Sequence, residues 1–185
     1  MSDAHGVARG RPWAALSSEY LFYRAIQRDG GSPHNGTTIP TVRAALRVDG
    51  QPVEEKWPYM EKLPANLKSW RPPDDPGVLY RRASSIVGHL FTDIWNAVEA
   101  DQAVVATLTL SGAFYRPDSD CVVDSPEPVD PRVRHAVVAI GTGMRGPQKM
   151  VLVRNSWGES WGCSGYAWLS EQYAAPRIFS AILIN

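Results

Sequence analysis

Two apolar stripes at helical spacing dominate the first hundred residues. Trp13, Leu16, Tyr20 and Tyr23 recur at intervals of three and four, which predicts a helix over 14–26. That helix should end near the glycines at 30 and 31, and a shorter one is expected over about 41–46. A second long stripe predicts a helix ending near residue 101, and its members are Ile86, Val87, Leu90, Phe91, Ile94, Trp95 and Val98.

The rest of the chain consists of short apolar runs separated by turn residues, a pattern typical of strands. A Pro- and Asp-rich segment at 68–76 and a longer one at 114–134 are expected to be surface connections. Helices therefore precede strands, which indicates the α+β class. The expected strands are 103–110, 135–141, 149–154, 165–170 and 178–184.

The composition narrows the classes of partner. The formal net charge is +0 and the pI is about 6.9, so we expect no nucleic-acid binding and no basic membrane surface. No apolar run is long enough to span a membrane, and residues 1–11 have no apolar signal core. We therefore expect a cytoplasmic protein. No Cys or His spacing suggests a metal site, and we expect no cofactor.

The chain has two cysteines, Cys121 and Cys163. This small number favours a reducing compartment, since secreted domains tend to carry several disulfides. A structural or incidental role is expected for both, and the sequence leaves open whether they pair, because pairing depends on their separation in space.

A polar residue stands at one end of each of two predicted strands. His135 opens the run 135–141, and Asn155 follows the run 149–154. An amide oxygen that accepts an imidazole N–H fixes the tautomer of the ring, as the third member of a nucleophile–histidine–orienter set does. Trp157 and Trp161 are expected to shield that hydrogen bond from water. The alternative interpretation is an aromatic hairpin without chemistry.

The pattern N-S-W-G-x-x-W-G-x-x-G-Y over 155–166, after a strand that begins His-Ala-Val, resembles the C-terminal half of papain-like cysteine peptidases. The resemblance implies one papain-like α+β domain over 1–185 with two lobes and a cleft between them. The first lobe would be helical over about 1–80, and the second an antiparallel sheet or barrel over about 100–185. The resemblance makes His135 the general base and Asn155 its orienter.

The same resemblance suggests where a polypeptide would bind. Gly30 and Gly31 lie roughly where the family pairs a Gly-Gly backbone edge with an extended peptide, although a helix C-cap explains them equally well. Trp157 and Trp161 are assigned to the same substrate-binding site. The run from Gln51 to Tyr59 also resembles the family.

The catalytic cysteine of this family begins the first long helix, but this chain has none there. Depending on the register, its position falls on one of four residues, Arg11, Pro12, Trp13 or Ala14, none of which can attack a carbonyl. The glutamine of the oxyanion hole is missing from residues 3–10 as well. Ser17 and Ser18 are expected to be ordinary helix residues, and neither cysteine is expected to act as the nucleophile.

The favoured hypothesis is a papain-like pseudopeptidase that binds a polypeptide or partner protein in its cleft without cleaving it. Its main rival is a cysteine-type endopeptidase whose nucleophile was replaced or is of an unusual kind. A third hypothesis is an interaction subunit that uses an exposed tryptophan-rich face at Trp57, Trp70 and Trp95.

Overall fold

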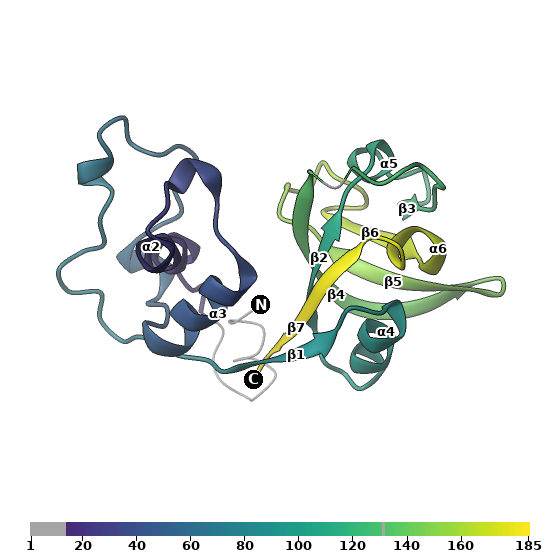
Figure 1. Cartoon of the computed structure of the whole chain (residues 1–185), viewed down its shortest axis with the longest axis horizontal. Helices are drawn as coiled ribbons and strands as arrows, with labels where there is room; N and C mark the ends of the chain where they lie inside the picture. Colours follow the sequence, from purple (N-terminus) through teal and green to yellow (C-terminus); the bar gives the residue numbers. More distant parts are fainter. Residues whose placement is uncertain (1–13, 131) are drawn as a thin grey trace. The chain divides into compact units, whose positions relative to one another are not determined.

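The computed structural model describes residues 14–130 and 132–185, so the nucleophile positions considered at 11–13 lie outside the described residues. The described chain forms two compact units. One unit runs to Ser84 and also holds Asn185, and the other spans Ser85–Ile184. The first is mainly helical and the second is a sheet with helices, which makes the protein α+β, as predicted (Figure 1).

The helical unit contains α2, Ser18–Asp29, and α3, Ile39–Val48. The Ser17 side chain caps α2 by accepting the N–H of Tyr20. Gly30 ends α2 in the left-handed conformation, with a φ of 63° that suits glycine. Three short 3-10 turns lie at Pro33–Asn35, Glu54–Lys56 and Leu67–Ser69.

Helix α2 begins four residues later than the apolar spacing predicts. The segment before it is extended and pairs with a distant stretch: the N–H of Glu54 donates to the carbonyl of Ala15 at 2.8 Å, and the N–H of Ser17 to that of Pro52 at 2.9 Å. Leu16 forms a β-bridge with Val53. Because this backbone is already paired, tertiary structure overrides the helical periodicity.

An aromatic cluster fills the helical unit. The ring of Tyr23 lies 5.4 Å from Trp57 and 5.1 Å from Trp70, and the Trp70 indole donates to the buried Glu19 carboxylate at 2.6 Å. Trp95 belongs to the other unit and packs against Phe91. The hypothesis of an interaction subunit called for these tryptophans to be exposed, but Trp70 is buried, and Trp57 and Trp95 are partly buried and belong to different units.

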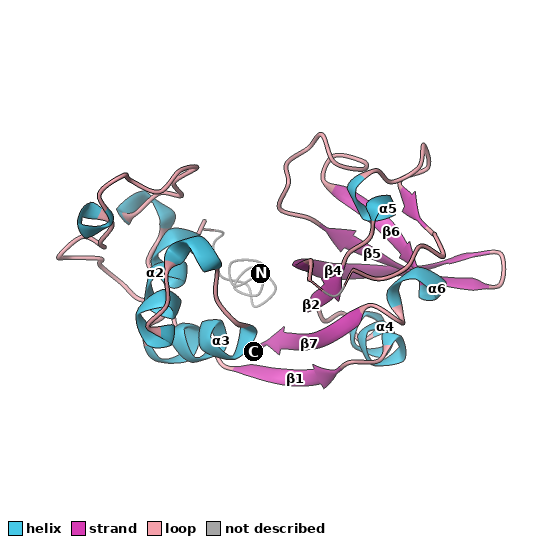
Figure 2. Ribbon diagram, turned by 45° about the horizontal axis from the view of Figure 1, so that its top comes forward, coloured by secondary structure: helices cyan, strands magenta, loops and turns pink. Residues whose placement is uncertain are grey.

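The second unit is a seven-stranded sheet in the order β1-β7-β2-β4-β5-β6-β3 (Figures 1 and 2). The central pairs are antiparallel, and β3 pairs with β6 in parallel. The strands are β1 Ser84–Gly88, β2 Val104–Thr109, β3 Val122–Val123, β4 Arg134–Arg145, β5 Gln148–Arg154, β6 Tyr166–Ser170 and β7 Ile178–Ile184. Its helices are α4 Phe91–Glu99, α5 Gly112–Tyr115 and α6 Glu171–Ala174.

The second apolar stripe is only partly helical, which corrects the prediction for its first residues. Ile86 and Val87 lie in the edge strand β1, which ends at Gly88, and His89 and Leu90 separate that strand from α4. Helix α4 starts after Leu90, whose N–H donates to the Asp93 side chain at 3.0 Å. A short run of β-branched residues fits a strand and a helix equally well by periodicity, and the sheet edge decides the outcome.

The core lies between one face of the sheet and the helices α4 and α6. Alternate residues of β2 are buried, as expected for a strand covered on one face. They pack with Phe91, Ile94 and Val98 of α4 and with Tyr173 of α6. This packing fixes the sheet on which the candidate site is built. No helix in the described ranges combines the length and the apolar character that a membrane span needs.

Candidate active site

The strand pairing brings His135 and Asn155 together. His135 stands at the start of β4 and Asn155 directly follows β5, and these neighbours run antiparallel with Val138 opposite Arg154. The start of β4 and the end of β5 therefore lie side by side, at the same end of the two strands. The His135 Nε2 and Asn155 Oδ1 atoms are 2.6 Å apart.

The amide of Asn155 is held in a fixed orientation. Its Oδ1 also accepts the backbone N–H of Ser156 at 2.8 Å, and its own backbone N–H donates to Gly165 at 2.9 Å. The side chain is buried, with 8% exposed. Because an amide oxygen only accepts, Nε2 of His135 must carry the proton, and in the neutral ring Nδ1 is left as the basic nitrogen.

Aromatic rings surround this hydrogen bond on two sides. The Trp157 ring lies 4.6 Å from the His135 ring, and the ring of Phe114 lies 5.8 Å from it. Phe114 is completely buried, whereas Trp157 keeps 37% of its surface exposed. Two aromatic rings thus pack against the imidazole, one completely buried and the other partly exposed, and His135 itself is partly buried.

The two tryptophans of the motif have different roles in the structure. Trp161 is buried, and its indole N–H donates to the carbonyl of Phe114 at 2.8 Å. Trp161 therefore packs against α5, while Trp157 is the more exposed of the two tryptophans. Gly162, at φ 56°, lies so close to the Tyr166 carbonyl that a side chain would collide with it.

The two cysteines form a disulfide, Cys121–Cys163. Since the chain has only these two, it contains no free thiol. A disulfide is typical of oxidising compartments, so the expectation of a reducing one loses its support. Sequence reasoning left the pairing open because the separation of the two residues in space was unknown.

The first turn of α2 and the described residues before it contain no cysteine. Ser17 is completely buried, and its hydroxyl donates to the carbonyl of Trp57 at 2.6 Å. Ser18 is exposed in the first turn, and Ala14 lies in the extended segment before the helix. In the described part of the chain, the N-terminus of α2 is capped by the Ser17 side chain.

The glycines assigned to peptide binding lie at the end of α2. Gly30 forms the C-cap of the helix, which is the structural alternative to the functional interpretation. Gly31 follows it in an exposed position. Pairing of this edge with an extended peptide remains a prediction.

Sequence reasoning missed an aromatic wall that faces Trp157. The Tyr115 ring stacks on Trp157 with centroids 5.2 Å apart and an interplanar angle of 16°. Tyr115 closes α5, in a segment that was interpreted only as a loop. The adjacent aromatic pair Phe114-Tyr115 was the signal that could have indicated it. Neither the loop nor any other described segment gathers three His, Cys, Asp or Glu side chains for a metal ion.

Comparison with known proteins decides the family. Residues 29–181 match the family model described as papain family cysteine protease. The chain belongs to the papain family of cysteine proteases. Papain-family membership agrees with the sequence motif around His135 and Asn155.

Curated relatives are peptidases that are longer than this chain. Cathepsin K of Gallus gallus is 26% identical over 169 residues, which cover 85% of this chain and 46% of the relative. The digestive cysteine proteinase 2 of Homarus americanus is 43% identical over 61 residues, or 33% of this chain and 16% of that protein. This chain thus spans less than half of the length of these relatives.

Solved structures of cysteine proteases share the fold. Xylellain from Xylella fastidiosa superposes with a TM-score of 0.77 at 20% identity, covering 100% of this chain and 75% of xylellain. A cysteine protease of Carica candamarcensis gives a TM-score of 0.71 at 18% identity, over 100% of this chain and 83% of that protein. The papain-like fold predicted from the motif is therefore confirmed.

Proposed function

We propose that this chain binds polypeptides at the site formed by His135, Asn155 and Trp157, and that its own residues do not cleave them. The observation that carries the proposal is the disulfide between Cys121 and Cys163. Peptidases of this type attack the amide carbonyl with a thiolate, and a disulfide sulfur has no thiolate form.

The rest of the site still suits an extended chain. His135 keeps a basic nitrogen at the edge of the sheet, and Trp157 offers a partly exposed aromatic face beside it. Aromatic faces next to hydrogen-bonding groups give large contact area at low cost in conformational entropy. Polypeptide is the ligand class on which papain-family relatives act, and it fits these groups.

A second candidate function is amide hydrolysis by a cysteine-type endopeptidase whose nucleophile was replaced or is of an unusual kind. It is favoured by the contact of 2.6 Å between His135 and Asn155, which holds the imidazole in the tautomer that a thiol needs as its base. Membership of the papain family agrees with this candidate.

Binding and cleavage can be measured on the same peptides. Fluorescently labelled decapeptides of mixed sequence should raise their anisotropy when titrated with the chain, and mass spectrometry should find them intact after prolonged incubation. Trp157→Ala should weaken binding, whereas Met144→Ala, an exposed apolar residue at the far end of β4, should not. No binding at all would refute the proposal, as would hydrolysis that His135→Ala abolishes.

The second candidate has to be tested on protein purified from the organism that produces it. An electrophilic epoxide that alkylates thiolates should then label one thiol per molecule and stop hydrolysis. If that material is neither labelled nor active on peptides, the cysteine peptidase candidate is excluded.

A further inference from the structure

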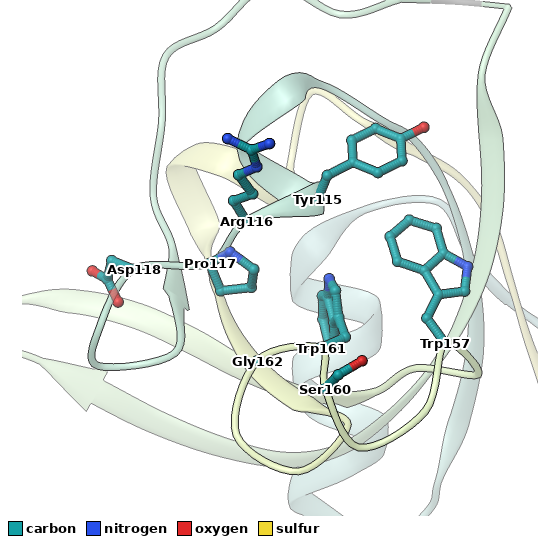
Figure 3. A pocket seen from close by; sticks show the side chains of 8 residues that line it. All are labelled: Tyr115, Arg116, Pro117, Asp118, Trp157, Ser160, Trp161 and Gly162. Carbon is teal, nitrogen blue, oxygen red and sulfur yellow. The ribbon is translucent and has the colours of Figure 1, made fainter.

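A pocket of about 470 Å³ opens beside the candidate site (Figure 3). One wall comes from the loop after α5, and the other from the turn after β5. Trp157 connects the pocket to the candidate site, because it lines the pocket and its ring lies 4.6 Å from the His135 ring. The lining residues are Tyr115, Arg116, Pro117, Asp118, Trp157, Ser160, Trp161 and Gly162.

Three aromatic side chains contribute to the lining of this pocket, together with charged and polar groups. Tyr115 and Trp157 stack on each other, and Trp161 and Pro117 belong to the same lining, as the close-up shows. The N–H of Trp161 is already taken by the Phe114 carbonyl. The rings offer contact area, and Arg116, Asp118 and Ser160 add polar groups to the same lining. The charged groups are the candidates for specific recognition of a ligand.

Arg116 is a charged residue of the pocket whose side chain forms no ion pair with the described residues. This side chain is exposed. Asp118 is occupied elsewhere: its carboxylate accepts the N–H groups of Asp120 at 2.9 Å and Val122 at 2.7 Å, and Arg145 lies 3.8 Å from it. The pocket therefore combines a flat aromatic surface with a free guanidinium.

The disulfide holds the two walls in place. Cys121 follows Asp118 by three positions on the first wall, and Cys163 directly follows Gly162 on the second. A covalent link so close to both linings limits how far the pocket can open or collapse. A site with preset walls loses less entropy when a ligand binds.

We propose that this pocket binds a carboxylate on a peptide held at the candidate site, with Arg116 as the group that recognises it. The inference rests on the proposed polypeptide binding and names the substrate class. The guanidinium donates two parallel N–H groups, a geometry that matches a carboxylate. The carboxylate can be the C-terminus of the peptide or an Asp or Glu side chain.

Three short peptides separate these sources: acetyl-trialanine with a free carboxylate, the same peptide as its amide, and acetyl-Ala-Glu-Ala-amide. Binding is read from the indole N–H signal of Trp157 in NMR spectra, assigned with Trp157→Phe. At least one of the two carboxylate peptides should bind about tenfold more tightly than the neutral amide, and added salt should reduce the difference. The stronger of the two identifies the source.

Variants of the pocket make the test specific. Arg116→Ala should remove the preference for the carboxylate, and Arg116→Lys should retain part of it. Arg132→Ala, which removes an exposed arginine paired with Asp130 outside the pocket, is the matched control and should change nothing. Tyr115→Ala should weaken the binding of charged and neutral peptides to the same extent.

Two results overturn the inference, and they differ in what else they affect. Equal binding of acid and amide, unchanged by Arg116→Ala, refutes carboxylate recognition and leaves polypeptide binding standing. Absence of binding by all three peptides, together with no binding of longer peptides, refutes both.

Discussion

The indole N–H of Trp161 donates to the backbone carbonyl of Phe114 at 2.8 Å, and this bond joins the turn after β5 to α5. Both residues are buried, and Phe114 in turn packs against the ring of His135. The position of the imidazole thus depends on a hydrogen bond made by a residue that does not touch it.

Trp161→Phe should therefore destabilise the fold without emptying the core. Phenylalanine retains most of the ring but leaves the buried Phe114 carbonyl without a donor, which costs roughly 1–3 kcal/mol. The free energy of unfolding in urea measures the loss. Trp157→Phe is the control and should cost less, because its ring is partly exposed. Equal effects of the two substitutions would contradict this role of the Trp161 N–H.

The tautomer of His135 provides a second prediction. In the neutral ring, ¹⁵N chemical shifts should place the proton on Nε2, since Asn155 Oδ1 can only accept. Asn155→Ala should give a mixture of both tautomers. A wild-type ring with its proton on Nδ1 would mean that this hydrogen bond is absent in solution.

Reduction of the disulfide should lower the stability of the fold and allow the two walls of the pocket to move apart. The cysteines are 42 residues apart in sequence, and a loop of that size corresponds to about 4 kcal/mol in the chain-entropy model. Cys163 is exposed, so a dithiol reductant can reach it. Melting temperatures with and without dithiothreitol measure the effect.

The double variant Cys121→Ala, Cys163→Ala is the control for reduction and should melt at the same temperature in both conditions. Two titratable thiols in the untreated protein would contradict the pairing. They would also restore a cysteine as a candidate nucleophile.

The contribution of Asp29, at the end of α2, to the stability of the fold should be lost at acid pH. Hydrogen bonds from the hydroxyls of Thr37 and Thr41 lower the pKa of Asp29 below its ordinary value. The ionised carboxylate therefore stabilises the fold above the ordinary pKa of about 4, and this contribution disappears as the pH falls through the lowered value. Asp29→Asn should flatten the acid side of the stability profile; an unchanged profile would contradict it.

The sequence predicted the hydrogen bond between His135 and Asn155 but not all of the residues that surround it. The strand ends at His135 and Asn155 were predictable because two apolar runs and a glycine-rich turn define them locally. Tyr115 and Arg116 were missed, since a loop carries no periodicity and its contact with Trp157 depends on the tertiary fold. Their place beside the site became apparent only with the stacked rings.

Two errors in the predicted elements have a common cause. The stripe around Trp13 and Leu16 suggested helix, yet the backbone before Ser17 pairs with residues 52–54. Ile86 suggested helix as well, but it lies in an edge strand beside β7. In both cases a distant segment supplied the backbone partners, and such partners leave no trace in local spacing.

The most direct measurement of the central claim follows a single sample of the chain mixed with an unlabelled peptide. NMR reports the His135 ring and the Trp157 indole, and mass spectrometry reports the peptide over the same hours. We predict that both protein signals shift and that the peptide mass stays constant. Peptide fragments produced by the wild-type chain, but not by His135→Ala, would contradict the claim, and so would signals that do not move.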